Sequence, residues 1–489
     1  MTTKTWDNST NSFFNAADWS PTGTPQSGDT AIINAGTVGV SGTSLQALTV
    51  QIKGSSSASP TLALTDAVVG VGTVLASAAT SGTVRINAAG TVVNQGVISF
   101  TGPTTAQFTT SLANGANGVP GLLQNLGSIA AIDASPYFVA TAAGQAFEND
   151  GAISLWNPSR GFQIATIGPA VTGTGTLLMN AYTQAELVQG IGAGQTIQFL
   201  NGTAGHALLQ IDQASGFHGT MSGFVQSDTL TLVNAPYTGY SYSPTDASHG
   251  VLTLTNGSAP VASLAFSGAY QTSDFNLGFT DLGGGRSITQ ITTTAASSAQ
   301  AFNITDVTLG QSTTDQGTAY NGPVSYLQHQ FIWNSPDGVA IATSASNSFL
   351  HGGSGDDALA VSSGQNVLDG GGGSNFLVGG NGADGGADTF FVDGRGGVVT
   401  WSTIVNFHHG DMATVFGFTA GTSTLPLTAS DGAAGYQGAT IHSELGGAGT
   451  GVNGSVTFAG LSLADVQNKL TMTTGNVGGA NYLLISYTG

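Results

Sequence analysis

The chain has 489 residues, with 74 glycines and no cysteine, and carries 7 Lys and Arg residues against 26 Asp and Glu residues, for a formal net charge of −19. This composition excludes disulfide bonds, and we expect no nucleic-acid partner because polyanions bind basic surfaces. Divalent cations would relieve much of the repulsion among the acids, so we expect calcium to act as a folding partner as well as a ligand.

Residues 1–50 are predicted to form an N-terminal cap or assembly segment. They lack the basic and apolar regions of a cleaved signal peptide. No segment of the chain reaches the roughly 18 consecutive apolar residues of a membrane span. Trp6, Phe14 and Trp19 are the candidate capping residues. A β-solenoid, which is predicted below for the following residues, needs such a cap because its last coil exposes apolar interior and strand edges. This segment resembles the opening segment of bacterial surface β-helix proteins. The alternative is a site where the aromatic side chains stack on sugars.

Three segments between residues 92 and 153 repeat an Asn-x-Gly turn between two β-rich runs, with the asparagines at Asn94, Asn125 and Asn149. The irregular offsets suit coils of a right-handed parallel β-helix with variable loops, predicted over residues 51–292. Asparagine tolerates a left-handed backbone at such a turn and can stack on its counterpart in the next coil. The alternative is a β-sandwich, although hairpins favour a two-residue Asn-Gly turn.

Alternating runs between residues 165 and 292 include Phe217-His-Gly-Thr-Met-Ser-Gly-Phe224 followed by Asp228-Thr-Leu-Thr-Leu232. They resemble the F-x-G-x-x-S-G-F module that stands beside RTX repeats in large exported proteins of alphaproteobacteria. The resemblance implies that this region forms the last coils of the solenoid. A Thr-, Ala- and Ser-rich stretch at residues 292–300 marks a boundary, and residues 293–342 are predicted to be a linker and the start of the next domain.

Four leucines, Leu350, Leu359, Leu368 and Leu377, stand nine residues apart within glycine-rich sequence. The repeat has the form G-G-x-G-x-D-x-U-x, which is typical of a calcium-binding parallel β-roll. Each repeat is expected to make half a turn, with a three-residue strand that points its aliphatic side chain inward and a six-residue loop that offers oxygen atoms. A flexible linker would not keep an aliphatic residue in phase over four periods. The overall prediction is therefore an all-β chain in which the β-helix is followed by a β-roll at residues 343–393.

The sixth residues of repeats on the same edge of the roll lie 18 positions apart. One predicted calcium site therefore combines Asp357 and Asn375 with backbone carbonyls, and the other combines Asn366 and Asp384 in the same way. An all-oxygen ligand sphere suits calcium, and a single carboxylate per site predicts weak affinity, at about 10⁻⁴ to 10⁻³ M. The alternative is an amide ladder without metal. The carbonyls come from Gly353, Gly355, Gly371 and Gly373 in the first site, and from Ser362, Gly364, Gly380 and Gly382 in the second.

After the repeats, residues 388–393 and 404–411 match the flanking pattern D-T-F…I-x-D-F-x-x-G-D of RTX proteins, with Asn406 in place of the customary aspartate. The repeats and flanks together are similar to those of RTX-type β-helix and β-roll surface proteins of Gram-negative bacteria. The resemblance implies one-step type I export by an uncleaved C-terminal signal, here within residues 394–489, and an extracellular or cell-surface location.

The sequence offers few catalytic residues. It has no H-E-x-x-H zinc motif and no G-x-S-x-G nucleophile turn. His408 and His409 are adjacent and would point to opposite faces of a strand. A calcium-dependent polysaccharide lyase or epimerase remains the alternative function, and Arg160 near Trp156 is its one candidate group. We therefore expect a non-enzymatic protein that associates with itself, as a matrix, filament, surface-layer or adhesin component, with cell-surface polysaccharide as a further candidate partner.

Overall fold

The computed structural model divides the chain into two compact units, Met1–Ala296 and Ser297–Gly489. It describes residues 2–7, 12–46, 48–70, 72–78, 82–103, 106–115, 118–159, 161, 163–200, 206–246, 249–294, 302–383, 385–395, 399–418, 427–443 and 454–489. Nearly all regular structure in these residues is β-strand, as the sequence predicts. No helix in these ranges is long and apolar enough to cross a membrane.

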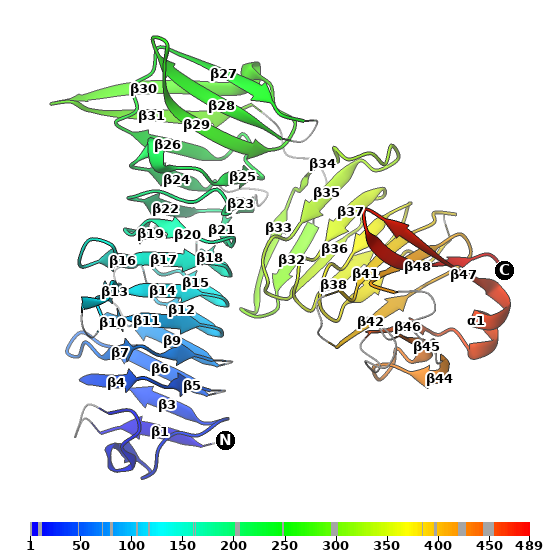
Figure 1. Cartoon of the computed structure of the whole chain (residues 1–489), viewed down its shortest axis with the longest axis horizontal. Helices are drawn as coiled ribbons and strands as arrows, with labels where there is room; N and C mark the ends of the chain where they lie inside the picture. Colours follow the sequence, from blue (N-terminus) through cyan, green and yellow to red (C-terminus); the bar gives the residue numbers. More distant parts are fainter. Residues whose placement is uncertain are drawn as a thin grey trace. The chain divides into compact units, whose positions relative to one another are not determined.

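The first unit is a parallel β-helix whose coils stack in one column from β1 to β26 (Figure 1). From β3 to β20, each coil contributes one strand to each of three sheets. The first sheet runs in the order β2 (Trp19–Ser20), β1 (Thr3–Trp6), β3 (Thr30–Ile33), β6 (Thr49–Gly54), β9 (Thr73–Ala78), β12 (Val97–Thr101), β15 (Ser128–Ile132), β18 (Ala152–Trp156), β21 (Thr176–Asn180), β23 (Thr196–Leu200), β25 (Thr220–Ser222), β29 (Ala259–Ser267), β28 (His249–Asn256), β27 (Gly239–Pro244).

The other two sheets complete the coils. The second runs in the order β30 (Phe275–Gly283), β31 (Arg286–Thr293), β26 (Thr229–Val233), β24 (Leu208–Ile211), β22 (Thr183–Leu187), β19 (Gln163–Ile167), β16 (Pro136–Ala140), β13 (Gln107–Ala113), β10 (Thr83–Ala89), β7 (Thr61–Thr65), β4 (Thr37–Ser41). The third is β20 (Val171–Thr172), β17 (Ala146–Asn149), β14 (Leu122–Asn125), β11 (Thr91–Asn94), β8 (Val68–Val69), β5 (Ser44–Leu45).

Alternating side chains fill the interior of the coils. Phe100, Phe108, Phe138 and Phe147 are all at most 1% exposed, and their rings contact one another at centroid separations of 5.4 to 6.0 Å. Full burial of one such side chain stabilises the fold by about 1.5–3 kcal/mol. The core of the first unit is therefore continuous from coil to coil.

The predicted asparagine stack is confirmed. Asn94 Nδ2 donates to Asn125 Oδ1 at 2.7 Å, and Asn125 Nδ2 donates to Asn149 Oδ1 at 2.8 Å. Asn149 Nδ2 then donates to Gln195 Oε1 at 2.9 Å, so a glutamine from two coils further along the chain extends the ladder. All four side chains are at most 1% exposed. The amide ladder therefore satisfies polar atoms that would otherwise be costly to bury.

The N-terminal residues close the first end of the β-helix. Trp6 and Trp19 are 5% and 1% exposed and meet edge to face at 5.5 Å, as a cap requires. Phe14, also predicted to cap, is instead 43% exposed, and its neighbour Phe13 is fully buried against Trp19. Phe13 and Phe14 lie in a turn and their rings meet edge to face at 5.3 Å, with Phe13 on the side of the core and Phe14 on the side of the solvent.

The far end of the β-helix differs from expectation. The resemblance implies coils to residue 292, whereas β27, β28 and β29 form an antiparallel meander and β30 and β31 an antiparallel hairpin. Only β29 continues the coil stack, by pairing in parallel with β25. Short turns, such as the one that contains Gly257 between β28 and β29, return the chain directly instead of around a coil. The hairpins therefore cover the last coil.

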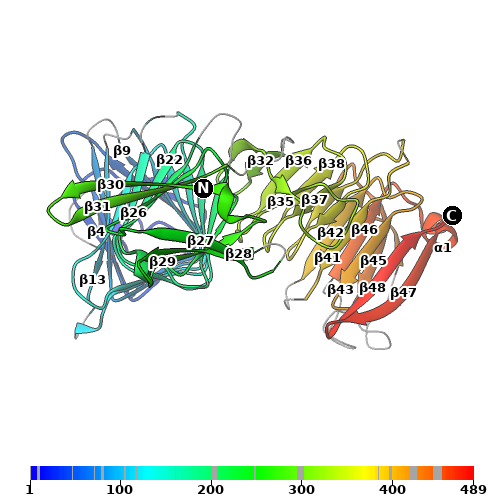
Figure 2. The same cartoon turned by 90° about the horizontal axis from the view of Figure 1, so that it is seen from above.

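The second unit is a two-sheet roll, and Figure 2 shows its sheets as two rows of strands. Along the sequence from β35 to β43, strands alternate between the sheets. One sheet runs β33 (Gln311–Asp315), β32 (Phe302–Asp306), β36 (Val339–Thr343), β38 (Ala358–Val361), β40 (Phe376–Val378), β42 (Thr400–Val405), β46 (Gly454–Ala459), β45 (Gly438–Ser443), β44 (Leu427–Asp431). The other runs β34 (Thr318–Ala319), β35 (His329–Ile332), β37 (Ser348–His351), β39 (Val367–Asp369), β41 (Thr389–Asp393), β43 (Met412–Phe416), β48 (Ala480–Tyr487), β47 (Leu470–Val477).

The nonapeptide leucines set the register of this roll. Leu350 pairs with Leu368 in one sheet and Leu359 with Leu377 in the other, and all four are fully buried. Nine residues therefore make half a turn, as predicted. The segment predicted as a linker and start of the roll contributes β32 to β36 to this unit. Helix α1 (Leu463–Lys469), capped by Ser462 and Asp465, stands among the closing strands.

Candidate metal centre in the loops of the roll

The loops between the strands of the second unit stack in two columns, and each column carries a ladder of side chains that accept a backbone N–H from the preceding turn of the roll. In the first column, the backbone N–H of Val339 donates to Asp357 Oδ1 at 2.9 Å. The N–H of Asp357 donates to Asn375 Oδ1 at 2.9 Å, and that of Asn375 donates to Ser402 Oγ at 3.1 Å. Asp357 and Asn375 therefore lie on one edge, as the repeat predicts.

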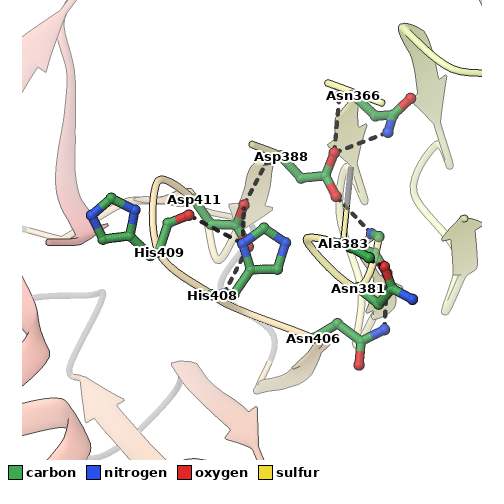
Figure 3. Close-up of polar contacts among 10 residues, drawn as sticks. Asn366, Asn381, Ala383, Asp388, Asn406, His408, His409 and Asp411 are labelled. Carbon is green, nitrogen blue, oxygen red and sulfur yellow. Dashed lines mark hydrogen bonds and ion pairs between the residues drawn. The ribbon is translucent and has the colours of Figure 1, made fainter. Parts of the chain in front are cut away.

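The second column has a different membership from the predicted one (Figure 3). The N–H of Ser348 donates to Asn366 Oδ1 at 3.0 Å, and the N–H of Asn366 donates to Asp388 Oδ1 at 2.9 Å. The N–H of Asp388 then donates to Asp411 Oδ1 at 2.7 Å. Asp384, which the sequence analysis paired with Asn366, lies outside the described residues. The partner of Asn366 is 22 residues away instead of 18, because this loop is four residues longer.

The longer loop also moves Gly380 and Gly382, two of the glycines whose carbonyl oxygens were predicted to bind the second calcium ion. Gly364 O faces Gly386, where an added Cβ would lie 2.1 Å from it. Gly382, predicted in that role, lies beneath the ring of His408, whose atoms would approach its Cβ to 2.9 Å. Gly380 N–H donates to Asp388 Oδ2 at 2.7 Å. The insertion therefore separates Gly380 and Gly382 from the positions that the nine-residue period assigns to them.

In the first column the predicted glycines stack closely, and their carbonyls face the next loop. An added Cβ at Gly371 would lie 1.8 Å from Gly353 O, and one at Gly373 would lie 2.2 Å from Gly355 O. Gly371 and Gly373 also have φ of 63° and 79°, which an L side chain rarely adopts. These two positions consequently require glycine both for backbone conformation and for space.

Five ladder side chains have a second polar atom. Asp357 differs from the other four in whether that atom has a hydrogen-bond partner. Asn375 Nδ2 and Asn366 Nδ2 each donate at 2.9 Å to the carbonyl three residues earlier in their own loops. Asp388 Oδ2 accepts the Gly380 N–H, and Asp411 Oδ2 accepts the His408 N–H at 2.9 Å. Asp357 Oδ2 is buried and has no hydrogen-bond partner within the described ranges.

The position of Asp357 Oδ2 explains why it has no partner. A Cβ on Gly352 would lie 2.4 Å from Asp357 Oδ2, and a Cβ on Gly370 would lie 2.5 Å from Asn375 Nδ2. The two atoms therefore take equivalent places in successive loops. The amide nitrogen is a donor and satisfies its own loop, whereas a carboxylate oxygen in that place can only accept. It requires a proton or a cation.

Burial raises the pKa of Asp357 to about 8, against the opposing effect of the Val339 hydrogen bond. The side chain is only 2% exposed, and water cannot offset the cost of its charge. A neutral acid would satisfy Oδ2 by becoming a donor. A bound cation would satisfy the same oxygen while keeping the group ionised.

The residues around Asp357 fit an oxygen-seeking cation, whereas those around Asn366 offer less. In the first column Asp357 Oδ2 is unpaired and lies against Gly352, in a glycine-rich loop whose backbone carbonyls could complete an oxygen donor set that suits calcium. In the second column the carboxylates of Asp388 and Asp411 already accept N–H groups, as an amide and acid ladder without metal would. Within the described ranges, no group of three or more His, Asp or Glu side chains is placed to hold an ion. Carbonyl oxygens would therefore supply most ligands.

Other predicted residues are placed as follows. Asn406 Nδ2 donates to Gly379 O at 3.0 Å, so its side-chain amide satisfies a backbone carbonyl of a neighbouring loop. His408 and His409 lie in the loop between β42 and β43, not on a strand; Figure 3 shows their rings apart, and His408 Nδ1 lies 3.5 Å from Asp411 Oδ1. Arg160 lies outside the described residues, and its neighbour Trp156 is 1% exposed.

Asp388, Asp411 and Ser402 are ladder members that were not predicted from the sequence. The signal for the first two was present, because both aspartates stand in the flanking pattern that follows the repeats. No protein-family model matches the chain, and no curated protein matches it significantly.

Proposed function

We propose that this protein is a non-enzymatic, calcium-binding structural component of an extracellular surface or matrix. The observation that carries the proposal is the buried, unpaired oxygen of Asp357 within stacked glycine loops. Asp357 and the carbonyls of Gly353, Gly355, Gly371 and Gly373 would hold the ion. The ion would supply positive charge to a carboxylate that has no donor.

The charge of the chain supports the same proposal. Its formal charge of −19 includes only 7 basic residues. The chain therefore has too few basic side chains to neutralise its acidic ones. Calcium would lower the repulsion between copies as well as within one chain. Millimolar calcium outside cells suits a weak site of this kind, at about 10⁻⁴ to 10⁻³ M. An extracellular location and type I export are parts of the proposal, carried by the resemblance of the repeats.

The β-helix supports an assembling role. Sheets of the first unit end in β2, β4 and β5 at one end, and an edge strand can pair with another chain where it is not covered, although Ser12 and Phe13 already pair with Gly39 of β4. Phe14 is 43% exposed at this end. We therefore propose end-to-end self-association of the N-terminal segment, in a filament, matrix or surface layer.

Light scattering and electron microscopy of the full chain, titrated with CaCl₂, test this function. We expect particle size to rise between about 0.1 and 1 mM calcium, the affinity range of extracellular sites, and to fall again with chelator. Asp357→Asn should shift or abolish the rise, whereas Asp281→Asn, which removes one charge at an exposed position of the first unit, should not. A monodisperse monomer at every calcium concentration would contradict assembly and favour a role in adhesion.

A further inference from the structure

A second buried acid lies at the start of the roll, outside the nonapeptide loops. Phe302, Ile304 and Asp306 alternate along β32 and are all fully buried. A carboxylate thus occupies the third of three inward positions, after two hydrophobic residues. Burial of a charged group without a partner is costly, so the environment of Asp306 needs an explanation.

Only one oxygen of Asp306 is satisfied. Asp306 Oδ1 accepts the N–H of Leu309 at 2.9 Å, which holds the turn between β32 and β33. Asp306 Oδ2 is buried and has no hydrogen-bond partner among the residues that the structure describes. The turn therefore accounts for Oδ1 and leaves Oδ2 unexplained.

The loop that carries Asp337 lies directly beside Asp306. Asp306 is paired with Val339 across the antiparallel strands, and the N–H of Val307 donates to Gly338 O at 2.8 Å. Asp337 is 8% exposed, and its Oδ2 accepts a hydrogen bond from Ser335 Oγ at 3.1 Å. Burial and the negative charge of Asp337 together raise the pKa of Asp306 to about 7.

We propose that Asp306 and Asp337 form a second divalent-cation site, for calcium, at the start of the second unit. Two buried carboxylates on adjacent segments repel each other unless a positive charge lies between them. Oxygen donors of this kind suit calcium. The inference rests on the proposed function for the identity of the ion, but it uses different residues.

This site is distinct from the one at Asp357. The neighbouring charge that acts on Asp306 is that of Asp337, whereas the one that acts on Asp357 is that of Asp356. Within the described ranges, the three buried acids do not form one group able to hold a metal ion. Two ions would therefore bind near the first turn of the roll, one to Asp306 and Asp337 and the other to Asp357.

Trp333 gives the sites an optical reporter. Its indole Nε1 donates to Asp337 O at 3.0 Å, and an added Cβ on Gly353 would lie 3.0 Å from Trp333 O. Terbium takes the place of calcium at oxygen sites and emits when a nearby tryptophan is excited. Terbium bound at either site should consequently emit upon excitation of Trp333.

The test counts bound ions on the full chain, by calorimetry with CaCl₂ and by terbium emission with TbCl₃. Asp306→Asn keeps the oxygen that accepts the Leu309 N–H and replaces Oδ2 with a donor, and it should lose one ion per chain. Asp337→Asn should lose the same ion, so the double variant should lose no more than one. Asp281→Asn is the control, because Asp281 is exposed and its Oδ1 likewise accepts a turn N–H, that of Gly283 at 2.8 Å.

An unchanged ion count in both Asp306→Asn and Asp337→Asn would overturn the inference. So would a variant that becomes more stable in chelator while it still binds as many ions, since the two acids would then share a proton. Asp357→Asn separates the two claims. If it loses an ion and Asp306→Asn does not, the proposed function stands and this inference fails; the reverse result supports this inference and removes the loop site.

Discussion

Asp357 Oδ2 and Asn375 Nδ2 occupy equivalent places one turn apart, each against the first glycine of its loop, yet only the nitrogen has a hydrogen-bond partner. The chain thus contains two forms of the same loop, one with a satisfied side-chain atom at this place and one with an unsatisfied oxygen. The asparagine loop shows which substitution should satisfy the aspartate loop without a proton or a cation.

Asp357→Asn should stabilise the protein in chelator and weaken its response to calcium. The new Nδ2 would be a donor where Asn375 has one, which removes a penalty of about 1–3 kcal/mol for an unsatisfied buried group. Denaturant unfolding of the full chain in EGTA and in 5 mM calcium measures both effects. Asp281→Asn, at an exposed acid of the first unit whose Oδ1 accepts the Gly283 N–H at 2.8 Å, is the control. Equal stability of wild type and Asp357→Asn in chelator would refute the assignment.

Stability without calcium should fall as pH rises. The pKa of Asp357, about 8 in the folded state, lies above its ordinary value of 3.8, so the folded state retains a proton that the unfolded state has lost. This contribution is complete below about pH 4 and is lost as pH rises through about 8. Unfolding midpoints in chelator at pH 5, 7 and 9 test the sign. Calcium should reverse the trend because it binds the ionised acid, and a rise in chelator from pH 5 to 9 would contradict the prediction.

Asn125→Ala should destabilise the β-helix. Asn125 accepts from Asn94, and its Nδ2 donates to Asn149 Oδ1 and to Ala152 O at 3.0 Å. Its loss leaves buried partners unpaired, at about 1–3 kcal/mol for each group. Chemical denaturation followed by circular dichroism gives the cost, with the exposed Asn276→Ala as control. A cost no larger than that of the control would show that the ladder contributes nothing.

Gly127→Ala should disrupt the coil at the Asn-x-Gly turn. An added Cβ would lie 2.2 Å from Gly96 O in the preceding coil, and backbone cannot yield as a flexible side chain can. Gly278→Ala, where nothing lies within 4 Å, should be tolerated. Limited proteolysis compares the two variants. We expect new cleavage in the first unit of Gly127→Ala only, and resistance equal to the wild type would count against close stacking at this turn.

The periodicity of the sequence was sufficient to predict the fold where it determines which side chains face inward. The leucines predicted the register of the roll, and Asn94, Asn125 and Asn149 predicted the amide ladder, because both patterns repeat once for each turn. The sequence did not identify Asp388 as a neighbour of Asn366, because residues 379–386 are rich in glycine and fit the nine-residue repeat in more than one phase. A four-residue insertion there shifts the phase without altering composition.

Other features depend on contacts that a local pattern does not encode. Phe13 and Phe14 are equally hydrophobic, and only the packing of Trp19 decides which one is buried. Asp306 and Asp337 are 31 positions apart and come together only when β32 pairs with β36. The antiparallel strands that close the β-helix likewise follow from turn geometry, which the alternating pattern of a strand does not report.

The amide ladder makes the length of the first unit adjustable. Successive asparagines are separated by 31 and then 24 residues, yet the hydrogen bonds between them differ by only 0.1 Å. Asn125 presents its amide N–H₂ to Asn149 in one neighbouring coil and its amide oxygen to Asn94 in the other, whatever the size of the loops between them. Whole coils could consequently be duplicated or deleted in the gene without a new interface, and the reach of the molecule could evolve in steps of one coil while both of its ends stay the same.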